Sequence, residues 1–276
     1  MAKSSDVISL FHGDCVSVCR DKIPSDTIDC IVTSPPYDGI RDYRNGASFD
    51  ANALGHELLR VLKDGCFAVV LIADQKKKKQ LSLTTARIML DWVDNVGFRL
   101  CDWLIYKRQG RIGRYHSFRR DHESILVFFK GDVPRDIDTE ALKKPVLVPS
   151  IGRSTNISMR NKGDVIGKRK FVAKSDLMCR GSVWEYKGWG GAMPVSKGWH
   201  LRHPAMMRDS LARDLVLAFS DKGDKVLDPF CGSGTTGAMC VPLGRSFVGI
   251  DISKEYCDLA AERIEIETSQ SSIFPV

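Results

Sequence analysis

Two kinds of hydrophobic pattern alternate along the chain. Short, nearly continuous apolar runs fit strands buried on both faces, and apolar residues three or four positions apart fit one face of a helix. The short runs predict strands at residues 7–11, 28–32, 66–72, 98–106, 124–129 and 246–250, with a further run opening at Val226. The wider spacing predicts helices at residues 15–23, 50–62, 81–95 and 205–220, and a charged helix from 254 to about 267.

This alternation predicts an α/β fold, in which a mostly parallel, twisted sheet carries helices on both faces. The periodic pattern is lost between residues 131 and 199, so we expect an irregular insert there. The chain is thereby divided into residues 1–130, the insert 131–199, and residues 200–276.

A glycine-rich turn follows the run that opens at Val226, in the stretch Asp228-Pro229-Phe230-Cys231-Gly232-Ser233-Gly234-Thr235-Thr236. Glycine has no Cβ, so the backbone can turn sharply and approach a ligand, and the next helix begins with free amides. The following strand ends at Asp251, and an acidic residue about 20 positions beyond such a turn can bind both hydroxyls of a ribose. The pattern favours a nucleoside cofactor over an ordinary strand-to-helix turn.

Features of the same turn argue against a phosphate cradle. No Lys precedes Thr235, as a nucleoside triphosphate loop requires, and the bare GxGxxG spacing that ends at Gly237 is a weak signal. The carboxylate of Asp228 would repel a pyrophosphate, so we expect a cationic or amino-bearing ligand.

A second candidate loop, Thr33-Ser34-Pro35-Pro36-Tyr37, directly follows the predicted strand 28–32. The two prolines end the strand and stiffen the loop. A rigid loop at the carboxyl end of a parallel strand is where open α/β sheets place their ligands and chemistry.

Basic residues are unevenly placed in a chain whose formal net charge is +7. They gather with Tyr115 and Phe118 at residues 107–122, and in the insert with Trp184, Trp189 and Trp199. Positive charge binds phosphate and aromatic rings stack on bases, so a surface that binds nucleic acid is favoured over a flexible surface segment without a binding role. The candidate contacts are Arg108, Arg111, Arg114, Tyr115, Arg119, Arg120, Lys168, Arg169 and Lys170. For the run of lysines from 76 to 79, a solvated helix start is favoured over a nucleic-acid contact.

Composition narrows the class of protein further. The 276 residues are 43% hydrophobic, no apolar run reaches the about 18 residues of a membrane span, and the first residues do not form a signal peptide. Nine cysteines include no CxxC pair and six histidines form no ligand cluster. We therefore expect reduced thiols in a cytoplasmic protein, and no metal site.

The two candidate loops together carry a family resemblance. A TSPPY motif at 33–37, followed far downstream by DPFCGSGTT at 228–236, resembles the β-group of S-adenosylmethionine-dependent DNA amino-methyltransferases. That group is defined by its order, with the catalytic motif first, the target-recognition region in the middle and the cofactor motif last. Stretches at 10–15, 121–128 and 203–205 are also similar, and the resemblance covers about residues 7 to 265.

The resemblance implies a Rossmann-like methyltransferase fold and a role for each motif. Residues 1–130 would be the catalytic half, 131–199 the target-recognition insert and 200–276 the cofactor-binding half. Asp251 would hold the ribose of S-adenosylmethionine and Asp14 would lie near its adenine. The full set of implied cofactor contacts is Asp14, Asp228, Pro229, Phe230, Gly232, Gly234, Thr235, Asp251 and Ile252. The target base would be held by Ser34, Pro35, Pro36 and Tyr37.

The chemistry implied for these residues is mainly positioning. A sulfonium methyl group is already activated, but an exocyclic amine is a poor nucleophile because its lone pair is delocalised. The Ser34 side chain and the Pro35 carbonyl are candidate acceptors for the amine hydrogens, and Tyr37 offers a face for stacking. In duplex DNA the base must flip out to reach them. No Pro-Cys pair is present for attack on cytosine C5.

The resemblance leaves several alternatives open. In this family, a serine directly before the two prolines, here Ser34, favours N4 of cytosine over N6 of adenine as the methylated atom. An RNA or protein methyltransferase and a non-catalytic DNA-binding protein are less favoured. Double-stranded DNA is the expected partner, and a nucleoid-associated location follows from it. A cognate restriction endonuclease, and either a monomer or a homodimer, are compatible with the resemblance.

Overall fold

The computed structural model describes residues 7–36, 50–108, 118, 121–145, 154–161, 164–172, 177–186 and 206–271. The chain forms two compact units. The larger comprises Met1–Asp138 and Ser182–Val276, and the smaller comprises Thr139–Gly181.

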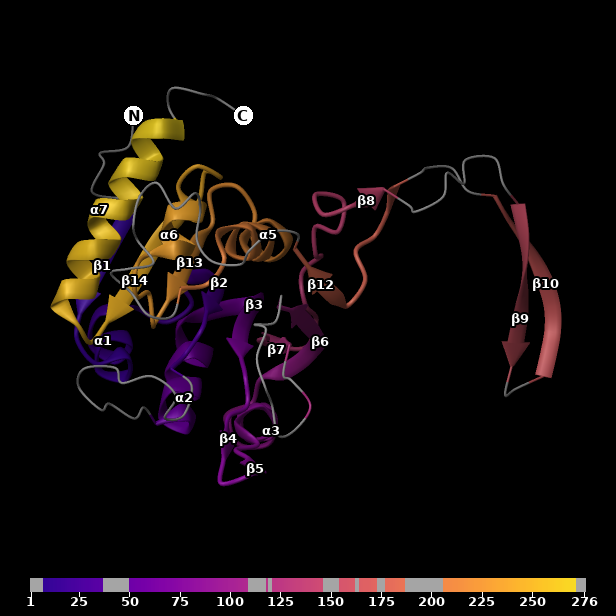
Figure 1. Ribbon diagram of the computed structural model, residues 1–276, viewed down its shortest axis with the longest axis horizontal. Coiled ribbons are helices and arrows are strands. Elements are labelled where there is room, and N and C mark those ends of the chain that lie inside the picture. The colour runs from indigo at the N-terminus through magenta and orange to yellow at the C-terminus, as the bar shows by residue number, and fades with distance from the viewer. Residues whose placement is uncertain are drawn as a thin grey trace. The chain divides into compact units, whose positions relative to one another are not determined.

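An eight-stranded sheet forms the larger unit, in the order β1-β14-β13-β2-β3-β7-β6-β12 (Figure 1). In chain order these strands are β1 (Ile8–His12), β2 (Ile28–Thr33), β3 (Leu62–Ile72), β6 (Arg99–Lys107), β7 (His122–Phe129), β12 (Val183–Glu185), β13 (Lys225–Asp228) and β14 (Ser246–Asp251). Neighbours are parallel from β1 to β3 and at β6–β12. Strand β7 runs antiparallel to both β3 and β6. The predicted mostly parallel α/β fold is confirmed, with β7 as an exception that the hydrophobic pattern did not indicate.

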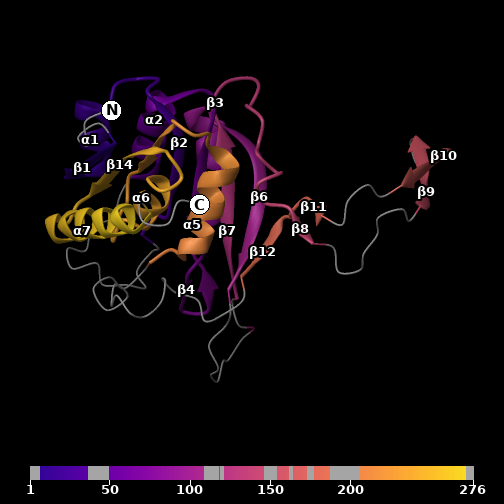
Figure 2. The ribbon, with the colours of Figure 1, turned by 90° about the horizontal axis from the view of Figure 1, so that it is seen from above.

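Helices cover both faces of this sheet. Their bounds are α1 (Cys15–Lys22), α2 (Ala51–Val61), α3 (Thr84–Asp91), α5 (Asp209–Phe219), α6 (Thr235–Cys240) and α7 (Lys254–Ser271), and a π-helical turn η2 (Trp92–Val96) continues α3. In the two ribbon views, α1 and α2 lie on one face and α5, α6 and α7 on the other (Figure 2). Each helix predicted from spacing is present, although the helix expected from residue 205 begins at Asp209.

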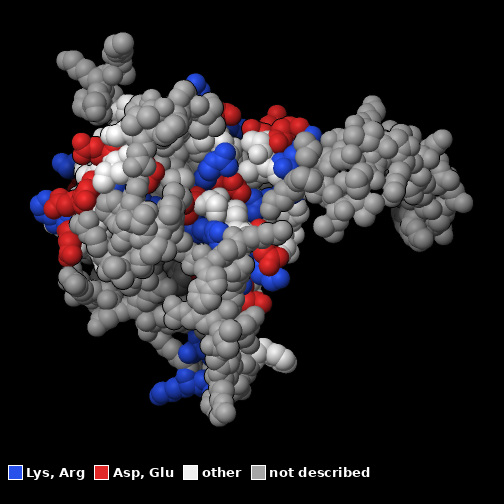
Figure 3. Space-filling view, turned by 45° about the horizontal axis from the view of Figure 1, so that its top comes forward, with Lys and Arg blue, Asp and Glu red and all other residues white. Residues whose placement is uncertain are grey.

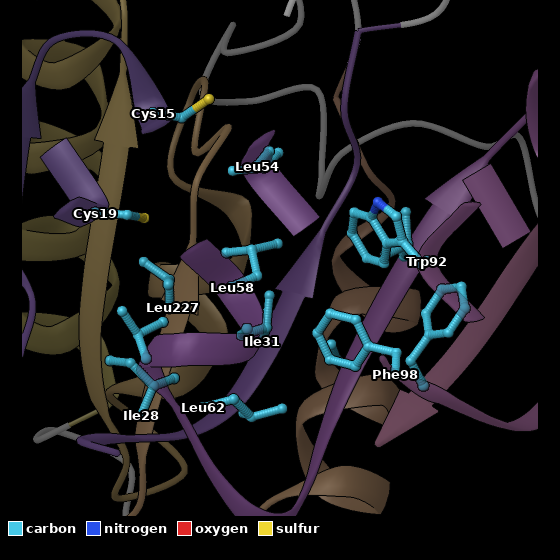
Figure 4. Packing of buried hydrophobic residues seen from close by; sticks show 14 of the residues in the cluster. Cys15, Cys19, Ile28, Ile31, Leu54, Leu58, Leu62, Trp92, Phe98 and Leu227 are labelled. Carbon is cyan, nitrogen blue, oxygen red and sulfur yellow. The ribbon is translucent and has the colours of Figure 1, made fainter. Parts of the chain in front are cut away.

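The core on the α2 face holds β2 and β13 together. Asp50 caps α2 by accepting hydrogen bonds from the Asn52 and Ala53 amides. The helix then buries Leu54 and Leu58 against the strand residues Ile31 and Leu227 (Figure 4). Apolar residues four positions apart lie on one helix face, so this spacing directs α2 onto the sheet.

An aromatic cluster extends the same core toward β7. The rings of Trp92 and Phe98 stack at 5.3 Å, and Phe128 lies 5.1 Å from Trp92. A Cβ atom at Gly55 would lie 2.7 Å from Trp92 Nε1, so only glycine lets α2 approach this ring. The indole donates a hydrogen bond to the Ala51 carbonyl at 2.9 Å, which satisfies its buried N–H.

The lysine run from 76 to 79 forms a hairpin instead of the predicted helix start. Strands β4 (Lys76–Lys77) and β5 (Gln80–Leu81) pair antiparallel, and Lys78 and Lys79 form the turn with φ values of 47° and 69°. The predicted helix start is wrong because these two residues adopt the left-handed conformation that a tight turn requires. Lys76, Lys78 and Lys79 are exposed, as a solvated run should be.

The smaller unit contains regular structure where an irregular insert was predicted. Strands β9 (Ser154–Asn161) and β10 (Asp164–Val172) form an antiparallel hairpin, and β8 (Lys144–Pro145) pairs with β11 (Leu177–Met178). Three consecutive basic residues in β10 conceal the alternation expected of a strand. The unit is also shorter than the stretch 131–199, because β12 joins the main sheet.

Trp184 corrects a second expectation for that stretch. It lies on β12 and is only 4% exposed, so it belongs to the core and not to a surface with exposed aromatic rings. Trp189 and Trp199 lie outside the described residues.

Most of the cysteines are small core residues. All nine are free thiols, and seven are buried, Cys101 and Cys179 being the exposed pair. Among the described residues no three His, Cys, Asp or Glu side chains gather as a metal site. No helix in the described ranges is long and apolar enough to cross a bilayer.

Candidate active site

Four of the predicted site residues lie at the carboxyl ends of four adjacent parallel strands. Asp14 follows β1, Asp251 ends β14, Asp228 ends β13 and Ser34 follows β2. These strands lie side by side in Figure 1. Parallel neighbours end at the same edge of a sheet, so both sequence motifs meet there.

A buried hydrogen-bond network joins the two motifs directly. The Thr33 hydroxyl donates to Asp228 Oδ1 at 2.7 Å across 195 positions of sequence. The Thr236 hydroxyl donates to Asp228 Oδ2 at 2.8 Å, and the Phe230 amide donates to Oδ1 at 3.1 Å. We call Thr33, Asp228, Thr236 and the Phe230 amide the Asp228 junction. The sequence had led us to expect that the Asp228 carboxylate faces a ligand. In the structure its side chain is only 4% exposed and forms its hydrogen bonds inside the protein.

Burial also controls the ionisation of this carboxyl group. Desolvation raises the pKa of Asp228 from 3.8 to about 6, although the hydrogen bonds from Thr33 and Thr236 act in the opposite direction. Desolvation likewise raises the pKa of Asp251, against the hydrogen bonds from the Ser253 and Gly232 amides. Both groups become easier to ionise if a cation binds beside them.

The glycine loop, residues 231–235, is held between Asp251 and α7. Gly232 and Gly234 have φ values of 49° and 75°, which favour glycine. The Gly232 amide donates to Asp251 Oδ2 at 3.0 Å. A Cβ on Gly234 would lie 2.9 Å from the Ala260 Cα, so a side chain there would push the loop away from α7. Gly234 is therefore required by the packing of the loop on α7, and the backbone conformation favours glycine at Gly232.

Asp251 is oriented but not fully occupied. Its Oδ1 accepts from the Ser253 amide at 2.8 Å and its Oδ2 from Gly232, while the side chain remains partly exposed. A carboxylate has about four acceptor sites, so two remain for the hydroxyls of a ribose. The neighbouring Ile252 is 48% exposed.

Asp14 and the loop that begins after β2 flank this central region. Asp14 caps α1 by accepting from the Ser17 amide and hydroxyl, both at 2.9 Å. Pro35 is buried, whereas Ser34 and Pro36 are partly exposed. Pro229 is buried in the turn after β13, and Phe230 packs partly against the core. Tyr37 lies outside the described residues.

The structure describes only part of the predicted DNA surface. Arg108 lies at the end of β6 and pairs with Glu123 at 2.7 Å, so one guanidinium nitrogen is engaged within the protein. The backbone of Lys168, Arg169 and Lys170 lies in β10. Arg111, Arg114, Tyr115, Arg119 and Arg120 fall outside the described residues. On the part of the surface coloured in Figure 3, Lys and Arg are interspersed with Asp and Glu.

Sequence reasoning missed three polar residues that organise the site. Thr33 and Thr236 belong to the Asp228 junction, and Arg263 donates to Thr235 Oγ1 at 2.8 Å. A signal for Arg263 was available, because it interrupts the apolar face that Leu259, Ala260 and Ile264 form along the last helix. The two threonines are end residues of the two sequence motifs, and nothing in the motifs themselves indicates that both side chains bond to Asp228.

A parallel α/β sheet with a glycine loop and acidic strand ends defines a Rossmann-like class that binds nucleoside cofactors. Within that class, the chain belongs to the N6_N4_Mtase family of DNA methylases, which matches residues 28–262. This confirms the predicted group, the S-adenosylmethionine-dependent amino-methyltransferases of DNA, and the chain is a DNA methyltransferase of the N4-cytosine or N6-adenine kind.

One relative supports this assignment by sequence, and two solved structures share the fold. The orphan methyltransferase M.BamHII of Bacillus amyloliquefaciens is 32% identical over 250 residues, covering 89% of this chain and 92% of the relative. The cytosine-N4-specific PvuII DNA methyltransferase has a similar fold, with a TM-score of 0.67, 16% identity and coverage of 96% and 91%. A DNA modification methylase of Thermus thermophilus, solved with S-adenosylmethionine, has a TM-score of 0.62 at 20% identity and coverage of 95% and 96%.

Proposed function

We propose that this protein transfers a methyl group from S-adenosylmethionine to the exocyclic N4 of a cytosine flipped out of duplex DNA. The observation that carries the proposal is the Asp228 junction. Its Thr33–Asp228 hydrogen bond links the first residue of the TSPPY motif to the first residue of the DPFCGSGTT motif. A base held by the first loop and a cofactor held by the second would therefore meet at one edge of the sheet.

The cofactor side of the site follows from the acidic strand ends. Asp251 would accept hydrogen bonds from the ribose hydroxyls, and Asp14 would lie near the adenine. Phe230, Gly232 and Gly234 would surround the methionine portion, with Pro229 shaping the turn and exposed Ile252 beside the ribose. The Thr235 hydroxyl already accepts a hydrogen bond from Arg263, so we assign its cofactor contact to the backbone.

The catalytic loop would orient the amine of the target base. Bound S-adenosylmethionine supplies an activated methyl group. The Ser34 hydroxyl and the Pro35 carbonyl would accept hydrogen bonds from the two amine hydrogens and direct the nitrogen lone pair along the line of transfer. Pro36 stiffens the loop, and Tyr37 would stack on the base. As the N–C bond forms, the S–C bond to the transferred methyl group would break with its electron pair staying on sulfur. The surplus proton on the nitrogen would then leave past the Ser34 hydroxyl to water.

The choice of base rests on Ser34 and on one structural relative. Serine at this motif position favours N4 of cytosine, and the similarly folded PvuII enzyme is cytosine-N4-specific. Adenine N6 is the second candidate, because adenine presents the same pairing of an exocyclic amine with a ring nitrogen.

The DNA contact is assigned to the basic stretch 107–122 and to the basic residues of β10. Phe118 within that stretch is fully exposed, as a side chain that stacks on a base would be before DNA binds. Phosphate contacts release counterions, so we expect DNA affinity to fall steeply between about 50 and 200 mM salt. A flat salt response would exclude these residues from the interface.

Nucleoside analysis tests the proposal. Purified protein is incubated with duplex DNA and methyl-labelled S-adenosylmethionine, and the digested nucleosides are separated by mass spectrometry. We expect labelled N4-methylcytosine, formed about 10³-fold more slowly by a Ser34→Ala variant. Labelled N6-methyladenine would replace the base assignment, and transfer to RNA or protein in place of DNA would overturn the proposal.

A further inference from the structure

A buried arginine of α7 lies beside the glycine loop, on the protein side. Arg263 is 1% exposed. Its Nη1 donates to Thr235 Oγ1 at 2.8 Å and to Ser233 Oγ at 3.3 Å, and its Nη2 donates to Asp209 Oδ1 at 2.6 Å. We propose that Arg263 is a positioning residue that holds the glycine loop in its cofactor-binding conformation, an inference that rests on the function proposed above.

The rest of this helix face forms a close support for the loop. Ala260, Arg263 and Ile264 are spaced to share one side of α7. A Cβ on Gly234 would lie 2.9 Å from Ala260, and a Cβ on Gly237 would lie 2.5 Å from Ile264 Cδ1. These contacts limit how closely the glycine loop and α6 approach α7. The hydrogen bonds of Arg263 then fix the orientation of the loop against α7.

The partner of Arg263 explains why an arginine is needed. The ion pair with Asp209 is buried on both sides, so replacing Arg263 by a neutral residue would remove a charge partner from a carboxylate in the protein interior. The planar guanidinium can bond the carboxylate with one terminal nitrogen and the loop hydroxyls with the other. A lysine ammonium is a single donor centre and cannot reproduce this fork.

The direction of these bonds connects Arg263 to cofactor binding. Ser233 and Thr235 are both buried and turn their hydroxyls toward Arg263. The alternate residues Gly232 and Gly234 are those assigned to the cofactor, and the Gly232 amide already bonds the ribose-binding candidate Asp251. Without Arg263, the inward residues lose their anchor, and part of the binding free energy of the cofactor is then spent on ordering the loop.

The test compares two buried arginines in the full-length protein. Arg263→Met removes the fork, Arg263→Lys keeps the charge opposite Asp209, and Thr235→Val removes the nearer loop acceptor. Arg245→Met is the matched control, because Arg245 is also buried but donates to the Ser220 and Leu243 carbonyls before the amino end of β14. Calorimetry gives the Kd for S-adenosylmethionine of each variant, and thermal unfolding without ligand gives its stability.

We expect Arg263→Met to weaken S-adenosylmethionine binding about tenfold and Arg263→Lys about fivefold, since charge-assisted hydrogen bonds are lost. Thr235→Val should also weaken it about fivefold, and the Arg263→Met/Thr235→Val double variant no more than about tenfold, because both changes remove one interaction. Arg245→Met should lower the unfolding temperature with a Kd within about twofold of wild type.

Several results would contradict this role. A Kd within about twofold of wild type for Arg263→Lys and Thr235→Val would overturn it, even if Arg263→Met failed to fold. If Arg245→Met weakened S-adenosylmethionine binding as much as Arg263→Met, the effect would reflect general stability. If the two fold-changes in Kd multiplied in the double variant, Thr235 would act independently of Arg263. If wild type itself bound no S-adenosylmethionine, the proposed function would fail instead.

Discussion

The two loops at the centre of the site are stabilised in different ways. The glycine loop after β13 is bonded to Asp251 on one side and to Arg263 on the other, and most of its residues are buried. The loop after β2 depends on two prolines and on Thr33 beneath it, while Ser34 stays partly exposed. Under the proposed function, the side of the site that would bind the cofactor is therefore held by more contacts, whereas the side that would receive the target base keeps Ser34 partly exposed.

Removal of the Ser34 hydroxyl should have the largest effect. If Ser34 accepts an amine hydrogen during transfer, Ser34→Ala should lower kcat about 10³-fold, as expected for a group that handles a proton in the transition state. The Kd for S-adenosylmethionine should stay within about twofold, because this side chain belongs to the other loop. Single-turnover transfer and calorimetry measure the two quantities. A Kd effect as large as the kcat effect would remove the distinction between the loops.

The raised pKa of Asp228 should make the free energy of unfolding depend on pH. Its folded-state pKa of about 6 exceeds the usual 3.8, so the folded protein retains a proton that the unfolded chain releases between these values. Its contribution to stability is therefore complete below about pH 4 and is lost as pH rises through about 6, a change of about 3 kcal/mol.

Asp228→Asn carries no such titration and can still bond Thr33 and Thr236. The free energy of unfolding of this variant minus that of wild type should thus increase by about 3 kcal/mol from about pH 4 to about pH 7. Urea denaturation across this range measures it. Parallel curves for the two proteins would show that Asp228 ionises as an ordinary carboxyl group.

Asp251→Ala should weaken S-adenosylmethionine binding about 30-fold, because hydrogen bonds to a carboxylate are lost and the Gly232 amide loses its acceptor. The rate of transfer at saturating cofactor should change much less. Asp258→Ala is a suitable control, since that exposed carboxylate pairs with Lys254 on α7. If Asp251→Ala instead lowered kcat about 30-fold and left the Kd for S-adenosylmethionine unchanged, Asp251 would act in the transfer step and not in cofactor binding.

Thr33→Val should give the smallest effect, a loss of about fivefold in the transfer rate, since one neutral hydrogen bond to the Asp228 junction disappears. Thr27→Val makes the same change at the amino end of β2, where the hydroxyl donates to the Pro24 carbonyl. Equal rates for the two variants would mean that the junction does not align the loops.

Local patterns in the sequence were sufficient for most of the fold. The strands before Ser34 and Asp251 were predicted because strands buried on both faces leave nearly unbroken apolar runs. The glycine loop was recognisable because Gly232 and Gly234 adopt conformations that glycine favours. Asp251 was found by its spacing from that loop. These features depend on a few neighbouring residues, so they can be read without a structure.

Long-range pairing decided the rest. The direction of β7 depends on its neighbours β3 and β6, and the β9–β10 hairpin is held by backbone hydrogen bonds that leave no side-chain pattern. The bond between Thr33 and Asp228 joins residues 195 positions apart, and Arg263 meets Asp209 only after α5 and α7 have both packed against α6. No local pattern encodes such a partner, because a side chain's environment exists only once the chain has folded.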